Sequence, residues 1–227
     1  MTKQDILDKA IYIQFPVTYG GYKEYNIPNV NRLPLPKKGE MYDNWPLNHN
    51  HFTTEYHRKN VIPLLNNILH LNYNENDFTI LPKSGQSNNC SFDISLLKPK
   101  KEYVYEVFGY NRNEHFDNLS FDDLTRNDSK KGGITDYHRM YKYGHESSRL
   151  INKTLEKEGN NRILFLSGDS QLIPDIAFLS CFFKEIFYID NRDRLSLADK
   201  YKDVEFTDII IEINNNPIKQ YTEVNLS

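Results

Sequence analysis

A serine, a histidine and an aspartate in the second half of the chain could act together as a nucleophile and its base. Asp136 and His138 are two residues apart, so in an extended segment both side chains point to the same side. A carboxylate that holds one imidazole nitrogen leaves the other nitrogen to take a proton from a serine hydroxyl, as in a Ser-His-Asp triad. Ser170, in the sequence Gly168-Asp169-Ser170, is the candidate nucleophile. The combination predicts covalent acyl transfer.

The residues around Ser170 should place it at one edge of a sheet. Ile163–Leu166 is apolar without alternation, which is typical of a strand buried on both faces. Pro174 suits the first turn of a following helix. Ser170 is therefore expected on a strand-to-helix turn, at the sheet edge where open α/β folds bind ligands. Its backbone N–H could then face a developing oxyanion.

Three apolar runs predict the buried strands of an α/β domain with a parallel sheet flanked by helices in the C-terminal half. One flanking helix, over Glu146–Glu158, should cross from His138 toward the strand before Ser170. The residues after the strands, namely Ser170, Asp190 and Asn214, should line one edge of the sheet. The three runs are Ile163–Leu166, Glu185–Ile189 and Thr207–Ile213.

The two motifs also point to a family. Thr-Asp-x-His ending at His138, followed by a helix, a strand and Gly-Asp-Ser, resembles the SGNH-hydrolase-like group that includes the alginate O-acetylation proteins and the DHHW family. The resemblance covers about residues 134–214, and its motif order is inverted relative to ordinary SGNH esterases. It implies an SGNH-like fold, with Ser170 as nucleophile, His138 as base and Asp136 as the group that orients the base. It also implies acyl transfer to a polysaccharide hydroxyl, with a glycan acceptor and an acyl donor as partners.

Two positions depart from the family pattern. The family has Trp after the histidine, where this chain has Arg139, and an aromatic residue often follows the serine, where this chain has Gln171. Arg139 could neutralise an anionic substrate or intermediate, or it could form a surface ion pair. The candidate substrate-binding residues are Arg139, Gln171, Tyr137, Tyr141, His145 and Asn214.

All 227 residues are predicted to form one SGNH-like domain. It comprises an irregular, α+β portion over residues 1–130, a catalytic α/β core over 131–216 and a tail over 217–227. The N-terminal portion should complete the fold or cover the site, and it should contain a helix over Phe52–Leu71 that Pro63 kinks. The polar segment 111–131 is expected to be a mobile stretch beside the pocket.

Composition excludes several classes of partner. The net charge of −3 gives no general attraction to nucleic acid. No apolar run approaches membrane-spanning length and no secretory segment opens the chain, so a cytoplasmic protein without membrane insertion is expected. No phosphate-binding loop or coenzyme A signature is visible, so no cofactor is predicted and the acyl donor stays open. The oligomeric state stays open too.

Three alternatives remain open at this point. The same triad could pass the acyl group to water, which would make the protein a carbohydrate esterase. A degenerate SGNH-like scaffold could instead bind glycans without turnover, a reading that Arg139 and Gln171 support. A metal-dependent hydrolase could use His49, His51 and His57, but these residues lack a recognised zinc-site spacing, so no metal site is predicted.

Overall fold

The computed structural model describes residues 1–16, 21–22, 27–37, 40, 52, 54–80, 97–110, 114–125, 147–169, 171–190 and 201–213. Within these ranges an eight-stranded sheet has the order β2-β1-β10-β8-β9-β7-β5-β6, and β3 and β4 form a separate pair. The strands are β1 (Ile11–Gln14), β2 (Asn31–Arg32), β3 (Phe78–Ile80), β4 (Leu97–Pro99), β5 (Val104–Gly109), β6 (Glu114–Ser120), β7 (Ser148–Asn152), β8 (Ile163–Gly168), β9 (Glu185–Asp190) and β10 (Asp208–Ile213).

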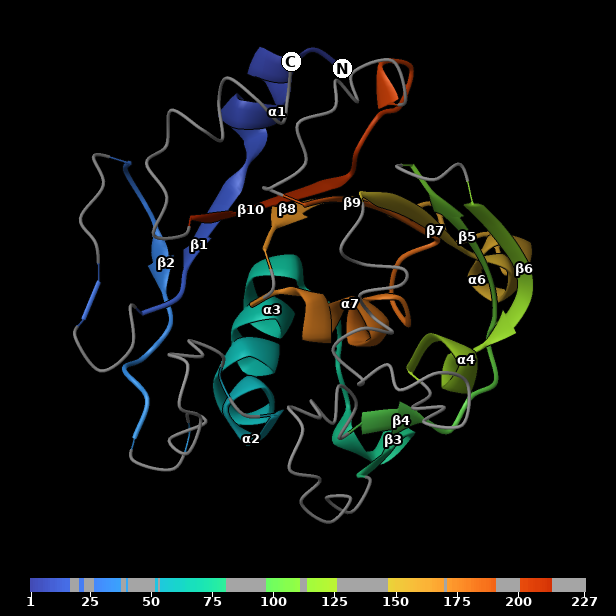
Figure 1. Ribbon diagram of the computed structural model, residues 1–227, viewed down its shortest axis with the longest axis horizontal. Coiled ribbons are helices and arrows are strands. Elements are labelled where there is room, and N and C mark those ends of the chain that lie inside the picture. The colour runs from blue at the N-terminus through green and yellow to red at the C-terminus, as the bar shows by residue number, and fades with distance from the viewer. Residues whose placement is uncertain are drawn as a thin grey trace.

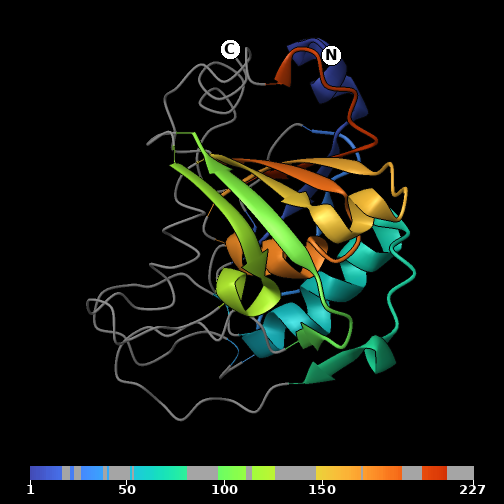
Figure 2. The same ribbon diagram turned by 90° about the vertical axis from the view of Figure 1, so that its right-hand side faces the viewer.

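The helices lie on both sides of this sheet (Figure 1). Helices α3 and α7 lie side by side against one face, and α1 lies on the other side, as the two ribbon views agree (Figures 1 and 2). None of the helices in the described ranges is long and apolar enough to cross a membrane. The helical segments are α1 (Lys3–Lys9), α2 (Thr54–Tyr56), η2 (His57–Val61), α3 (Ile62–Leu69), η3 (Glu75–Asp77), α4 (Phe121–Thr125), α6 (Lys153–Lys157) and α7 (Ile173–Leu179).

The sheet is mixed rather than wholly parallel. The neighbours β2, β1, β10, β8 and β9 pair in parallel, whereas β7 pairs antiparallel with β9 and with β5, and β5 pairs antiparallel with β6. The α/β class with a parallel core is therefore confirmed, and its parallel part is confined to one half of the sheet. Because β1, β2, β5 and β6 come from residues before 130, the N-terminal portion supplies strands to the same sheet as the C-terminal half.

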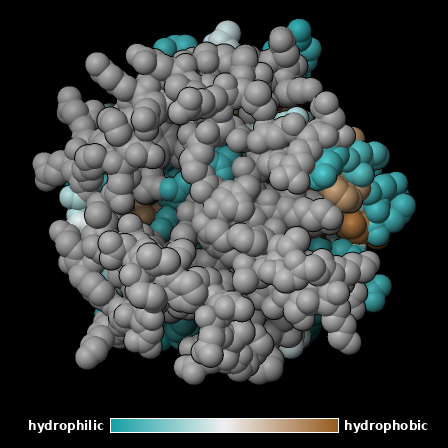
Figure 3. Space-filling model, viewed as in Figure 1, coloured by the Kyte–Doolittle hydropathy of each residue, from teal (hydrophilic) through white to brown (hydrophobic). Residues whose placement is uncertain are grey.

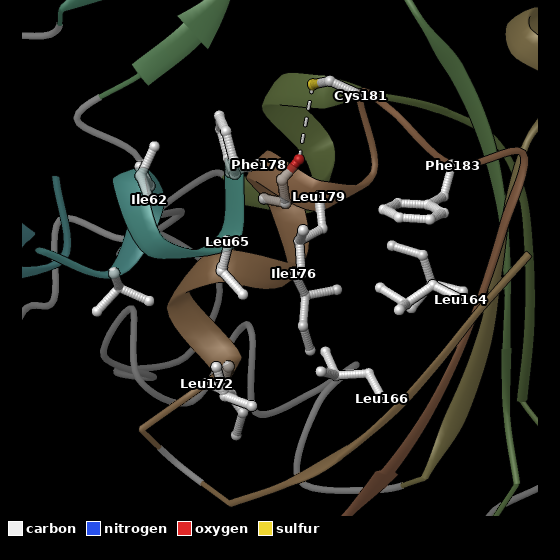
Figure 4. Close-up of a cluster of buried hydrophobic side chains, with 14 of the residues drawn as sticks. Ile62, Leu65, Leu164, Leu166, Leu172, Ile176, Phe178, Leu179, Cys181 and Phe183 are labelled. Carbon is white, nitrogen blue, oxygen red and sulfur yellow. Dashed lines mark hydrogen bonds between the residues drawn. The ribbon is translucent and has the colours of Figure 1, made fainter. Parts of the chain in front are cut away.

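Strands β8, β9 and β10 are buried along almost their whole length, as their continuous apolar runs predict. On one face Leu164 and Leu166 of β8 pack toward Ile176 and Leu179 of α7 (Figure 4). On the other face a second cluster covers the sheet, and it includes Phe165, Phe187, Ile209, Ile211, Phe206 and, from α1, Ile6. These two layers fix the position and direction of the end of β8.

The helix predicted over Phe52–Leu71 is found from Thr54 to Leu69, with an irregular turn in its middle. The π-helical turn η2 comes directly before α3, and Pro63 lies in the first turn of α3. Proline has no N–H for the helical ladder and its ring crowds the preceding turn, which a widened π turn accommodates. The predicted break at Pro63 thus takes the form of a π turn that begins at His57.

Two predicted elements are wrong. The helix expected over Glu146–Glu158 is instead the strand β7 followed by the short helix α6. The apolar residues Leu150 and Ile151 suit either period, and pairing with β5 and β9 decides in favour of a strand. The segment 111–131, expected to be a mobile stretch, contains the edge strand β6 and the helix α4.

Strand β6 carries a polar pattern because it lies at the edge of the sheet. Its side chains are intermediate or exposed throughout. In the space-filling view the described residues in this region are mostly hydrophilic around a small hydrophobic group (Figure 3). Polar edge strands discourage pairing with other chains, and they resemble loops in sequence.

Candidate active site

Most of the predicted site residues lie outside the described part of the chain. Asp136, Tyr137, His138, Arg139, Tyr141, His145, Ser170 and Asn214 all do, and their roles stay predictions. Gln171 is described, as is the chain up to Asp169 on the other side of Ser170. The site can therefore be built from the elements that flank Ser170.

The predicted change from strand to helix around Ser170 is confirmed. Strand β8 ends at Gly168, and α7 begins at Ile173 with Pro174 in its first turn. β8 lies between β10 and β9, all three parallel, so Gly168 is at the carboxyl end of the parallel part of the sheet. Open α/β sheets bind their ligands at this edge.

Asp169 organises the turn through its own hydrogen bonds. The backbone N–H of Gln171 donates to Asp169 Oδ1 over 2.8 Å, and the backbone N–H of Leu172 donates to the Asp169 carbonyl over 3.2 Å. An aspartate that accepts from the residue two positions on is a common turn-forming arrangement. Gln171, a predicted substrate-binding residue, has a buried side chain.

Glu212, on β10, lies directly behind this turn and was not predicted as a site residue. The backbone N–H of Asp169 donates to Glu212 Oε2 over 2.9 Å. The Tyr188 hydroxyl, on β9, lies 3.4 Å from the Gly168 carbonyl oxygen and 3.5 Å from that of Asp169. The N–H and the carbonyl groups at the end of β8 are thus held from the two neighbouring strands.

The Glu212 side chain is 0% exposed, although it is a carboxyl group. Burial raises the pKa of Glu212 well above its ordinary value, and the neighbouring carboxyl group of Asp169 and the charge of Asp190 raise it further. The backbone hydrogen bond from Asp169 lowers the pKa, but the net effect of these surroundings favours the protonated form of Glu212. Its Oε1 atom has no hydrogen-bond partner among the residues that the structure describes.

Three acidic residues thus gather at this edge of the sheet, namely Asp169, Asp190 and Glu212. Within the described ranges, no group of three or more histidine, cysteine or acidic side chains has the arrangement of a metal site.

A second buried pair was also missed. His57 Nδ1 lies 2.9 Å from Asp175 Oδ2, and the two side chains are 5% and 2% exposed. Sequence analysis considered His57 with His49 and His51 as possible metal ligands and predicted no metal site. His49 and His51 lie outside the described residues, and His57 pairs with a carboxylate. The available signal was Asp175 itself, an acidic residue inside the otherwise apolar helix α7.

The His57 pair joins the π turn to the helix that follows Ser170. The aromatic ring of Phe15 lies 5.9 Å from the imidazole, centroid to centroid, and that of Tyr56 lies 6.3 Å away. In this apolar setting a carboxylate needs a partner, because an isolated buried charge is costly. The pair therefore fixes the start of α7 relative to η2.

Comparison with solved structures identifies the architecture. A DHHW family protein from Eubacterium siraeum superposes with a TM-score of 0.59 and 12% identity, over 99% of this chain and 86% of the other. PatB1 from Bacillus cereus, solved with a sulfonyl adduct, gives a TM-score of 0.60 and 11% identity, over 98% and 87%. A second PatB1 structure gives 0.54 and 12%, over 93% and 85%. The fold is SGNH-like.

This SGNH-like fold confirms the architecture that the Asp-x-His and Gly-Asp-Ser motifs implied. No family model and no curated protein matches the sequence. At 11–12% identity the structural likeness concerns the fold, which here extends over nearly the whole chain. In this fold the chain places Gly168 and Asp169 at the carboxyl end of a central strand.

Proposed function

We propose that this SGNH-like protein is a serine-dependent acyltransferase that acts on a carbohydrate, such as a polysaccharide O-acetyltransferase or a related glycan-modifying enzyme. The observation that carries the proposal is the end of β8. Gly168-Asp169, directly before Ser170, closes a buried central strand at the ligand-binding edge of an SGNH-like sheet. The likeness to PatB1, a protein solved with a sulfonyl adduct, supports an activated nucleophile in this fold.

The proposed reaction has two steps. His138 takes the proton of the Ser170 hydroxyl as its oxygen attacks the carbonyl carbon of an acyl donor, and Asp136 stabilises the imidazolium. The ester bond to the donor breaks, and His138 returns the proton to the departing alcohol. A sugar hydroxyl then attacks the acyl-serine and loses its proton to His138, which returns it to Ser170. With water in place of the sugar the same steps describe an esterase.

The first test is the intact mass of the protein after exposure to a fluorophosphonate or a sulfonyl fluoride. One adduct is expected in the wild type, none in Ser170→Ala, and a reduced amount in His138→Ala and Asp136→Asn. Ser167→Ala is the matched control, because Ser167 is a serine within β8, the strand that precedes Ser170. This variant should keep the adduct. A folded wild-type protein that gains no mass would contradict the triad and favour the glycan-binding scaffold.

The second test separates transfer from hydrolysis. The protein is given an activated acetyl ester, with and without oligosaccharides. A transferase should yield acetylated oligosaccharide and should consume the ester faster when the acceptor is present. A rate of ester consumption that no acceptor changes would indicate the esterase reaction instead.

A further inference from the structure

The carboxyl group of Glu212 lies directly against Gly168 at the end of β8. A Cβ atom added to Gly168 would lie 2.7 Å from Glu212 Oε2 and 2.9 Å from Leu172 Cδ1. These distances are shorter than real Cβ contacts, so the carboxyl group occupies the space that a side chain at position 168 would need. The glycine at the end of β8 therefore leaves the room that the Glu212 carboxyl group of β10 occupies.

The same carboxyl group binds the backbone that leads to Ser170. Glu212 Oε2 accepts the N–H of Asp169 over 2.9 Å, and Asp169 Oδ1 accepts the N–H of Gln171 over 2.8 Å. These two bonds form a chain from β10, through the residue before Ser170, to the residue after it. A shift of Glu212 would move both ends of the segment that contains Ser170.

The protonation of Glu212 affects this chain of bonds through the Asp169 side chain. Among the residues that the structure describes, the titratable groups that act most on Glu212 are Asp169, at the end of β8, and Asp190, at the end of β9, and both are acidic. A neutral Glu212 can share a hydrogen bond with the Asp169 side chain. An ionised Glu212 would repel that carboxylate, which is the group that holds the N–H of Gln171.

We infer that Glu212 is a positioning residue, which holds the Asp169 backbone and, through the Asp169 side chain, the two residues that flank the proposed nucleophile Ser170. The inference rests on the proposed acyl transfer for its functional meaning. Glu212 acts through Asp169 and takes no part in the covalent steps. A misplacement of about 1 Å is enough to slow a positioned reaction on the order of a hundredfold.

The test measures the rate of fluorophosphonate addition at Ser170 by intact mass, from neutral to alkaline pH. Wild-type protein should react more slowly at alkaline pH, as Glu212 ionises. Glu212→Gln keeps the shape and cannot ionise, so it should react within about twofold of wild type at neutral pH and keep its rate at alkaline pH. Glu212→Ala should react at least about tenfold more slowly at every pH.

Glu185→Gln is the matched control. Glu185 is also a buried glutamate, but it is the first residue of β9 and pairs with Arg149. It should show the wild-type pH profile. An alkaline loss in Glu212→Gln equal to that of wild type would overturn the inference. A wild-type rate in folded Glu212→Ala would overturn it as well.

Hydrogen exchange tests the positioning without any reaction. The Asp169 amide should exchange faster in Glu212→Ala than in wild type, while Glu212→Gln stays protected and the amides of β8 before Gly168 do not change. Unchanged exchange at Asp169 would overturn the inference. If wild type forms no adduct at Ser170, the proposed function fails, and exchange still decides whether Glu212 holds the turn.

Discussion

The imidazole of His57 and the carboxylate of Asp175 lie 2.9 Å apart, buried where the π turn η2 meets helix α7. Removing one partner leaves a buried polar group without its hydrogen bond, which costs about 1–3 kcal/mol. We expect His57→Ala to lower the free energy of unfolding by about that amount in urea titrations. The partly exposed pair of Arg58 and Glu55 is the control, and Arg58→Ala should cost less than about 1 kcal/mol.

A double-mutant cycle sharpens this prediction. If each side chain satisfies the other, the double variant His57→Leu/Asp175→Leu should lose less free energy of unfolding than the sum of the two single variants. In the double variant no unpaired polar group remains. Strictly additive losses would show that the two side chains contribute independently of each other. The same variants also report on function, since a stability change that leaves fluorophosphonate labelling intact would assign the pair a structural role.

Gly168→Ala should destabilise the protein by about 1–3 kcal/mol, because the new methyl group has no space between Glu212 and Leu172. Thermal unfolding measures this loss, and labelling of Ser170 should slow in parallel. Gly159→Ala is a useful comparison, since nothing lies within 4 Å of the added Cβ and only the positive φ of 79° is unfavourable. It should cost about 1 kcal/mol and leave labelling unchanged.

The free energy of unfolding should depend on pH in part through Glu212. Below the ordinary pKa of a glutamate, 4.5, the folded and unfolded chains both hold the proton and this group has no effect. Above that value the unfolded chain releases the proton while the folded chain keeps it, because its pKa is raised. Stability should therefore fall as pH rises, until the pH passes the raised pKa.

Glu212→Gln removes this contribution. The difference between wild type and Glu212→Gln in the free energy of unfolding should change with pH by up to about 1.4 kcal/mol per pH unit in that window. Urea titrations at several pH values measure it. Parallel curves for the two proteins would show that Glu212 is ionised in the folded state.

Cys181 should be inert in the folded protein. Burial raises the pKa of its thiol to about 12, and its Sγ donates to the Ala177 carbonyl over 3.7 Å (Figure 4). The thiolate is the reactive form, so almost none is present at pH 8. In a Cys90→Ser background, iodoacetamide should modify Cys181 only in urea. Modification of the native protein at the rate of a free thiol would contradict the buried placement.

The sequence was a good guide where burial alone determines an element. Strands β8, β9 and β10 are covered on both faces, so their apolar runs are continuous and easily recognised. Pro174 likewise marked the start of α7. Strand β7 was mistaken for a helix because pairing with distant strands, rather than its own pattern, makes it a strand.

The site was harder to predict because its contacts join distant parts of the chain. Glu212 was visible as a charged residue within the apolar run of β10, and Asp175 as one within α7, but neither position names its partner. His57 and Asp175 are 118 residues apart in the chain. Local spacing instead grouped His57 with its sequence neighbours His49 and His51.

The strand order has a consequence for how the protein matures. Strand β1, near the start of the sequence, pairs in parallel with β10, near its end, and β10 in turn pairs with β8. During synthesis β1 and β2, which pair with each other, must therefore wait for β10 before they can join the rest of the sheet. Because β10 also carries Glu212, the turn before Ser170 gains this support only when β10 has paired with β8, and nascent chains without β10 lack it.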